Sequence, residues 1–286
     1  MRYQSMDECK KSLQGVVETE GKVGVANRDL RREQAIDRLV FNGVFHENPE
    51  IKQAARNIVR ESARALAIQP ASILPLYEAR GRGECKGFTV PAINIRGLTY
   101  DMARAVFRAA LLNQVGAVIF EIARSEIGYT AQRPSEYAHV VIAAAIKEGF
   151  TGPLFIQGDH FQVSAKNFAK NRQAEVQALK ELIKEAIEAE FFNIDIDSST
   201  LVDLSKPTVR AQQQDNCEVA AELTAFLRPL EPRGVSISVG GEIGEVGGKN
   251  STVEELEAFM EGFREELDKR GKDFKGISKI SIQTGT

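Results

Sequence analysis

From Phe88 to the C-terminus, short apolar runs alternate with longer amphipathic segments. Parallel strands require a crossover of a dozen or more residues between them, usually a helix, so this alternation predicts a parallel α/β fold. Each apolar run is bounded by Gly, Pro, Asn or Ser. The six predicted strands are residues 88–95, 117–123, 153–159, 191–197, 234–240 and 277–283.

Two of the intervening segments have clear helical signals. In residues 251–271 apolar side chains recur at helical spacing, Ser251 and Glu254 fit a capping box, and Gly271 fits a C-terminal cap. In residues 174–190 the apolar side chains form one stripe and the other positions are mostly charged. We expect this second helix to cover the outside of a sheet.

The N-terminal region follows a different pattern. Residues 28–41 and 48–67 read as two charged helices with no strand between them. We therefore predict an N-terminal helical extension, residues 1–80, followed by the α/β domain, residues 81–286. The extension is expected to pack on the main domain or on a second subunit, and its Arg-rich faces are expected to be solvated.

Charge and hydropathy exclude several classes of protein. The chain has 37 basic and 40 acidic residues, a net charge of -3, and hence no broad electrostatic footprint for nucleic acid or an anionic membrane. No stretch approaches the roughly 18 apolar residues of a membrane span, and the N-terminus lacks the apolar core of a signal peptide. Three widely spaced cysteines (Cys9, Cys85 and Cys217) suit a reducing compartment. We expect a cytoplasmic protein.

Polar residues at strand ends are the candidates for chemistry, because parallel α/β folds bind ligands at the carboxyl ends of their strands. Strand by strand, they are Asn94 and Arg96; Glu121, Arg124 and Ser125; Asp159 and His160; Asp195, Asp197, Ser198 and Ser199; Glu242; and Gln283, Thr284 and Thr286.

The fourth predicted strand places Asn193, Asp195 and Asp197 on one face, alternating with apolar residues. Buried polar residues are costly unless they serve a ligand or one another. For Asp195 two interpretations stay open, a ligand contact and a hydrogen-bonded polar layer inside a barrel. Asp197 lies at the strand tip, where we expect a functional role.

Two candidate metal ligands lie at different strand ends. His160 follows Asp159 after the third strand, and Glu242 begins a glycine-rich loop after the fifth. Because strand ends meet at one mouth, these side chains can converge on a cation. Of the other histidines, His46 lies in the helical extension and His139 in a predicted helix, and both are interpreted as structural.

From about Ile73 onward the chain resembles the class II, metal-dependent ketose-bisphosphate aldolases. The resemblance is carried in order by "FTVPAINI" on the first strand, "QGDHF" after the third, "IDSSTL" on the fourth and "GGEIGEVGG" after the fifth. It implies a (β/α)8 TIM barrel and reversible cleavage of a ketose bisphosphate, of the fructose 1,6-bisphosphate type, to dihydroxyacetone phosphate and an aldehyde.

The same resemblance implies roles for individual residues. His160 and Glu242 would bind Zn²⁺, and Asp159 would be the catalytic acid/base. Aldol cleavage leaves an enediolate whose charge a divalent cation can hold, and a nearby carboxylate can move the proton. We expect a small phosphorylated sugar substrate, a homo-oligomer, and no nucleic-acid or membrane partner. The residues implied to contact the substrate are Asn94, Asp197, Ser198, Gly247 and Gly248.

The sequence departs from the family pattern in several places. Gln157 stands where a histidine is frequent, Glu121 where a glutamine is usual, and Ala123 where a serine is common. Two further ligand histidines, expected after the sixth and seventh strands of the family, are absent, and so are the last two barrel strands, which leaves about six βα units. We expect these 286 residues to be a piece of a longer polypeptide that, by itself, binds zinc weakly and has no turnover.

Two other functions stay open. Lys279 lies early in the sixth strand and alternates with Ser281 and Gln283, so it could serve as the amine of a Schiff-base aldolase. The long helical extension and the missing ligands also fit a non-catalytic aldolase-like partner subunit.

Overall fold

The computed structural model describes residues 1–11, 17–19, 23–25, 35–244 and 249–284. Its elements belong to two compact units, each described by itself. Unit 1 consists of Met1–Pro70, Val90–Phe120 and Thr130–Phe155, and unit 2 consists of Ala71–Thr89, Glu121–Tyr129 and Ile156–Thr286.

Unit 1 is mainly helical. Its short strands β1 and β2 pair antiparallel, and β3 pairs in parallel with the beginning of β6, Ile68 opposite Gly152. The elements are α1 (Met6–Lys11), β1 (Val17–Thr19), β2 (Val23–Val25), α3 (Ile36–Phe45), α4 (Pro49–Ala65), β3 (Ile68–Pro70), β4 (Ala92–Asn94), α6 (Thr99–Leu112) and α8 (Pro134–Glu148).

The helices α3 and α4 confirm the two helices predicted near the N-terminus, of which residues 28–34 lie outside the described part. Asn48 starts α4 because its side chain accepts the backbone N–H groups of Glu50 and Ile51. The strand β3 was not predicted, since three residues are too few to show a period. The domain division at residue 80 stays a prediction.

Unit 2 alternates strands with helices. Its elements are α5 (Leu74–Gly81), α7 (Arg124–Thr130), α9 (Ala165–Lys170), α10 (Arg172–Glu188), β7 (Asn193–Asp197), η2 (Ser199–Leu201), α11 (Val209–Gln212), α12 (Gln214–Leu227), η3 (Arg228–Leu230), β8 (Ser238–Glu242), α13 (Val253–Asp268) and β9 (Lys279–Ser281). Two strands, β5 (Ile119–Ala123) and β6 (Gly152–Gln162), contribute residues to both units.

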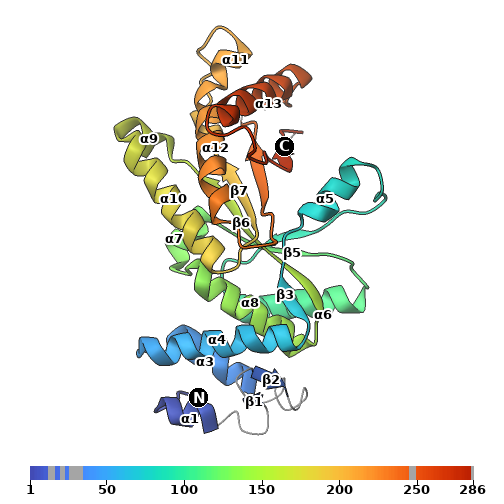
Figure 1. The fold of residues 1–286 in the computed structure, drawn as a ribbon, viewed down its shortest axis with the longest axis vertical. Helices are drawn as coiled ribbons and strands as arrows, with labels where there is room; N and C mark the ends of the chain where they lie inside the picture. Colours follow the sequence, from blue (N-terminus) through green and yellow to red (C-terminus); the bar gives the residue numbers. More distant parts are fainter. Residues whose placement is uncertain (12–16, 20–22, 26–34, 245–248, 285–286) are drawn as a thin grey trace. The chain divides into compact units, whose positions relative to one another are not determined.

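The strand order of the main sheet is β4-β5-β6-β7-β8-β9, the same as the order along the chain. In unit 2, the pairs β6–β7, β7–β8 and β8–β9 are parallel (Figure 1). Sequential parallel strands joined by helices are the arrangement of a (β/α)8 barrel. The predicted fold class, an incomplete barrel of about six βα units, is confirmed.

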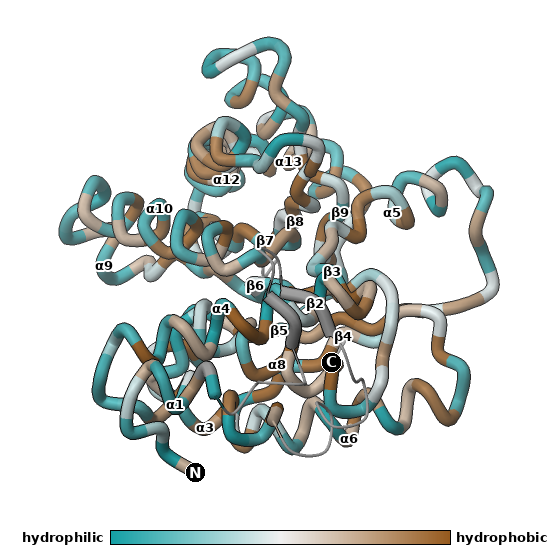
Figure 2. The backbone as a smooth tube through the Cα atoms, turned by 60° about the horizontal axis from the view of Figure 1, so that its bottom comes forward, coloured by the Kyte–Doolittle hydropathy of each residue, from teal (hydrophilic) through white to brown (hydrophobic). Residues whose placement is uncertain are grey.

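Helix α10 has the predicted amphipathic character. Its apolar stripe is buried, and hydrophilic residues alternate with it along the helix in Figure 2. Asn171 caps the helix by accepting the backbone N–H of Ala174. The buried stripe consists of Val176, Leu179, Leu182, Ile183 and Ile187.

The predicted capping box of α13 is wrong by one residue. Thr252 Oγ1 accepts the N–H of Glu255, whose carboxylate accepts the N–H of Thr252. Ser251 is engaged elsewhere, because its Oγ accepts the N–H of Gln283. The C-terminal cap is Lys269 rather than the predicted Gly271.

Asn193 attaches the segment before α5 to the sheet. Its side chain donates to the carbonyl oxygens of Ala71 and Ile156, and its Oδ1 accepts the N–H of Ile73 at 2.8 Å. The side chain is fully buried. We predict that Asn193→Ala lowers the free energy of unfolding by about 3 kcal/mol, because three buried groups lose their partner. Urea denaturation checks this, with the exposed Asn113→Ala as control; equal stability of the two variants would contradict it.

Candidate metal centre

A β-bulge presents His160. Between β6 and β7 the register shifts, because Gly158 lies opposite Ile194 whereas Phe161 lies opposite Ile196. The extra residue gives His160 a φ of 40°, in the left-handed region that non-glycine residues seldom adopt. A Cβ on Gly158 would lie 2.5 Å from Cζ of Phe161, so the bulge requires glycine there. The local bend sets the direction of the Asp159 and His160 side chains.

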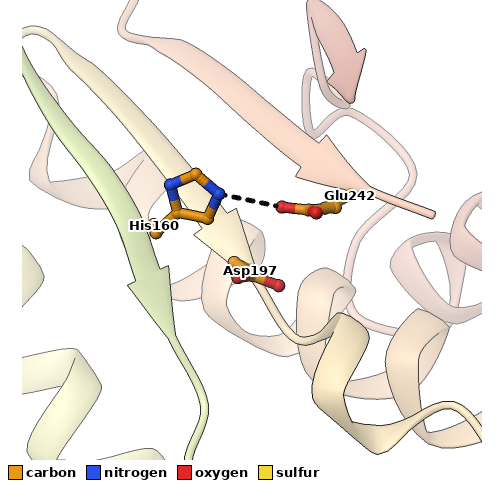
Figure 3. A group of neighbouring side chains, drawn as sticks. All are labelled: His160, Asp197 and Glu242. Atoms are coloured by element: carbon orange, nitrogen blue, oxygen red, sulfur yellow. Dashed lines mark ion pairs between the residues drawn. The ribbon is translucent and has the colours of Figure 1, made fainter. Parts of the chain in front are cut away.

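The His160 imidazole lies between two carboxylates. Nδ1 is 2.6 Å from Oδ1 of Asp159. Nε2 is 3.4 Å from Oε2 of Glu242, the ion pair marked in Figure 3. Donation of the Nδ1 proton to Asp159 fixes the ring orientation and the tautomer. In the neutral ring, the Nε2 lone pair is then directed toward Glu242, as in a carboxylate–histidine–metal arrangement.

Asp197 completes a group of three. One ligand atom from each of His160, Asp197 and Glu242 lies within 4.8 Å of the others, and Figure 3 shows them on three neighbouring strand ends. Asp197 is buried and oriented by donors: Oδ1 accepts from the N–H and hydroxyl of Ser199, and Oδ2 accepts from Gln162 at 2.6 Å. The sequence pattern placed Asp197 among the substrate contacts, whereas the structure adds it to the candidate ligands.

The electrostatics of the group favour a cation. The hydrogen bond to Asp159 raises the pKa of His160 to about 9, against the opposing effect of burial and with a further contribution from Glu242. Burial, followed by the charge of Asp197, raises the pKa of Glu242 to about 7. At neutral pH the metal-free imidazole is therefore protonated, and its Nε2 proton lies where a cation would bind.

The geometry fits a transition-metal ion. Two ligands bound at 2.0–2.1 Å to a tetrahedral zinc ion are about 3.3 Å apart, and the Nε2–Oε2 distance here is 3.4 Å. Imidazole with carboxylate oxygens is a donor set that Zn²⁺ accepts. These three residues can hold a divalent cation.

A polar layer lies on the same strands. Gln157 donates to Glu121 at 2.5 Å and to Asp195 at 3.1 Å, and Nζ of Lys279 is 2.9 Å from Asp195 and 2.7 Å from Gln157. Burial, followed by the charge of Asp159, raises the pKa of Glu121 to about 7. For Asp195 the structure supports the polar-layer interpretation.

An ammonium held by a carboxylate is not a free nucleophile, so these contacts lend no support to a Schiff base at Lys279.

The other residues predicted for the site do not belong to the group of three in the described part of the chain. Ser198 is buried, and its hydroxyl contacts Asn216 of α12 rather than the cluster. Asn94 ends β4 in unit 1, and its role as a substrate contact stays a prediction. Gly247 and Gly248 lie outside the described residues.

The two histidines interpreted as structural are both buried in unit 1. His46 contacts the Tyr3 carbonyl through Nε2 and the Asn48 N–H through Nδ1, each at 3.0 Å. His139 packs against Gly43, where a Cβ would lie 2.1 Å from its Nε2. Among the described residues neither joins the candidate ligand group.

A partial parallel barrel with an imidazole and carboxylates gathered at its strand ends defines a class of metal-dependent α/β enzymes. The family model described as "Fructose-bisphosphate aldolase class-II" matches residues 80–269, more than half of the chain. The chain belongs to the class II fructose-bisphosphate aldolase family, which is generally metal-dependent.

The structure is similar to the crystal structure of a probable tagatose 6 phosphate kinase from Sinorhizobium meliloti 1021. The TM-score is 0.53 at 18% identity, over 69% of this chain and 50% of that chain. The likeness concerns the fold, and this chain spans half the length of that protein. No curated protein matches the chain. In the described part of the chain, no helix combines the length and apolar character needed to cross a membrane.

Proposed function

We propose that the chain is part of a zinc-dependent aldolase that cleaves a ketose bisphosphate of the fructose 1,6-bisphosphate type to dihydroxyacetone phosphate and an aldehyde. The observation that carries the proposal is the grouping of His160, Asp197 and Glu242 at neighbouring strand ends. This grouping occurs in a chain whose family performs aldol chemistry.

Each residue of the cluster has a proposed task. A divalent cation, when bound, supplies electrostatic stabilisation to negative charge that develops on substrate oxygens. His160, Asp197 and Glu242 would hold it, and Asp159 keeps the imidazole oriented through Nδ1. Asp159 is also the proposed acid/base for the substrate hydroxyl, because it is a carboxylate next to the cation site.

The remaining predictions belong to the same proposal. The substrate is a small phosphorylated sugar, contacted by Asn94, Ser198 and the backbone of Gly247 and Gly248. Residues 1–80 act as a helical extension, and the protein is a cytoplasmic homo-oligomer.

An activity assay tests the proposal. The product of the natural reading frame is incubated with fructose and tagatose bisphosphates, with and without a chelator. We expect release of dihydroxyacetone phosphate that is abolished by chelation and restored by Zn²⁺. Turnover that survives complete metal removal would contradict the metal role, and release of no triose phosphate from either bisphosphate would contradict the aldolase.

Metal affinity should rise with pH. His160 and Glu242 must both be deprotonated to bind a metal ion. In the metal-free chain the pKa of His160 is about 9 and that of Glu242 is about 7. Below pH 7 zinc displaces two protons, so its affinity should rise roughly a hundredfold per pH unit. Between pH 7 and 9 it displaces one proton, and the affinity should rise roughly tenfold per pH unit. Calorimetry between pH 6 and 8.5, in buffers of different ionisation enthalpy, measures the released protons.

Asp159→Asn provides the control for this pH dependence. It removes the carboxylate that raises the pKa of His160, so the slope above pH 7 should become shallower. A flat profile in the unmodified chain would show that these residues are not the ligands.

A further inference from the structure

The polar layer lies one pleat before the candidate metal ligands. Asp195, Gly240 and Lys279 are register partners on β7, β8 and β9. Two residues further along the same strands are Asp197, Glu242 and Ser281. Because residues two apart on a strand face the same way, the layer and the ligands project from the same side of the sheet.

The contacts of the layer close a ring around Lys279. Its Nζ lies 2.9 Å from Oδ1 of Asp195 and donates to Oε1 of Gln157 at 2.7 Å. With its carbonyl oxygen fixed by Lys279, the Gln157 amide must present its NH₂ group to the carboxylates. It donates to Oδ2 of Asp195 at 3.1 Å and to Oε2 of Glu121 at 2.5 Å. One ammonium therefore determines the orientation of side chains from β5, β6 and β7.

Gly240 makes room for this ring. A Cβ at this position would lie 2.3 Å from Oδ1 of Asp195 and 2.9 Å from Cε of Lys279. The face of β8 at Gly240 is therefore covered by the ion pair, which links β7 to β9 across it.

We infer that Lys279 is a positioning residue for the metal centre: by pairing with Asp195 and orienting Gln157, it holds the ends of β6 and β7 at the spacing at which His160, Asp197 and Glu242 share one cation. The inference rests on the proposed metal site. It assigns Lys279 no contact with the cation or the substrate.

The test uses the full 286-residue chain and three variants. Lys279→Met removes the ammonium and keeps most of the side-chain volume. Asp195→Asn combined with Lys279→Met removes both charges, so no buried charge is left without its partner. Lys184→Met is the matched control. Lys184 is exposed on α10, and its ion pair with Glu188 is long at 3.9 Å and also exposed.

Zinc affinity is measured by calorimetry, the geometry of the site by the visible spectrum of bound Co²⁺, and stability by metal-free thermal unfolding. We expect Lys279→Met to weaken zinc binding by roughly 10–100-fold, as for other groups that orient metal ligands, and to change the Co²⁺ spectrum. The double variant should recover the unfolding temperature but not the affinity. Lys184→Met should match the unmodified chain in all three measurements.

The outcomes separate this inference from the proposed function. If the unmodified chain is folded and binds neither Zn²⁺ nor Co²⁺, the metal site fails and the positioning role with it. If the unmodified chain binds zinc and Lys279→Met binds it equally well, only the positioning role is overturned. If Lys279→Met does not fold, the double variant decides: unmodified affinity and Co²⁺ spectrum would show that the pair serves stability alone.

Discussion

His160→Ala is expected to lower the zinc affinity of the chain at least about a hundredfold, because it removes the nitrogen ligand and leaves only two carboxylates from neighbouring strands. The same change in the product of the whole reading frame should remove aldol cleavage. Calorimetry and the dihydroxyacetone phosphate assay provide the measurements. Zinc binding equal to that of the unmodified chain would refute the assignment of His160.

The backbone at residue 160 supplies a control for folding. Alanine retains the cost of a φ of 40°, whereas glycine does not. His160→Gly should therefore be more stable than His160→Ala by about 1 kcal/mol while binding zinc just as poorly. Equal loss of metal affinity in two variants that differ in stability would separate ligand loss from misfolding.

Gly240→Ala is expected to lower the free energy of unfolding by about 3 kcal/mol and to weaken zinc binding. The added Cβ would lie 2.3 Å from Asp195 Oδ1, so the ion pair with Lys279 must separate or the strands must move. Urea denaturation measures the loss.

Gly128→Ala is the matched control for this substitution. Gly128 lies in α7, where a Cβ meets no atom within 4 Å, so alanine should be neutral or slightly stabilising. Equal stability of the Gly240 and Gly128 variants would show that the space beside residue 240 is not required.

Much of the architecture could be predicted because each element carries its own period. The alternation of apolar runs and amphipathic stripes indicated β5 to β9 and α10 without knowledge of their neighbours. Strand ends were located approximately, since an apolar run terminates at a polar residue: the predicted ends at 159 and 240 fall before the ends of β6 at Gln162 and of β8 at Glu242. That is why His160 and Glu242 could be selected from the sequence, and the structure places them 3.4 Å apart.

What the sequence could not provide depends on how strands align with each other. Alternation put Lys279 and Asp195 each on a polar face, but their ion pair requires the register of β7, β8 and β9. The bulge in β6 was missed for the same reason, because an extra residue is defined only against a partner strand. Gly158 directly before Asp159 was the available signal.

The α13 cap was displaced because two adjacent residues, Ser251 and Thr252, are both good caps, and a distant bond to Gln283 decides between them.

In the bulge of β6, the candidate metal ligand and the carboxylate that orients it are consecutive residues of the chain. Closing so small a loop costs far less entropy than joining residues from separate strands. The orientation of one of the three candidate ligands is therefore encoded by a short peptide, "GDHF". The position of that imidazole relative to Asp197 and Glu242 depends on the pairing of β6 with β7 and of β7 with β8.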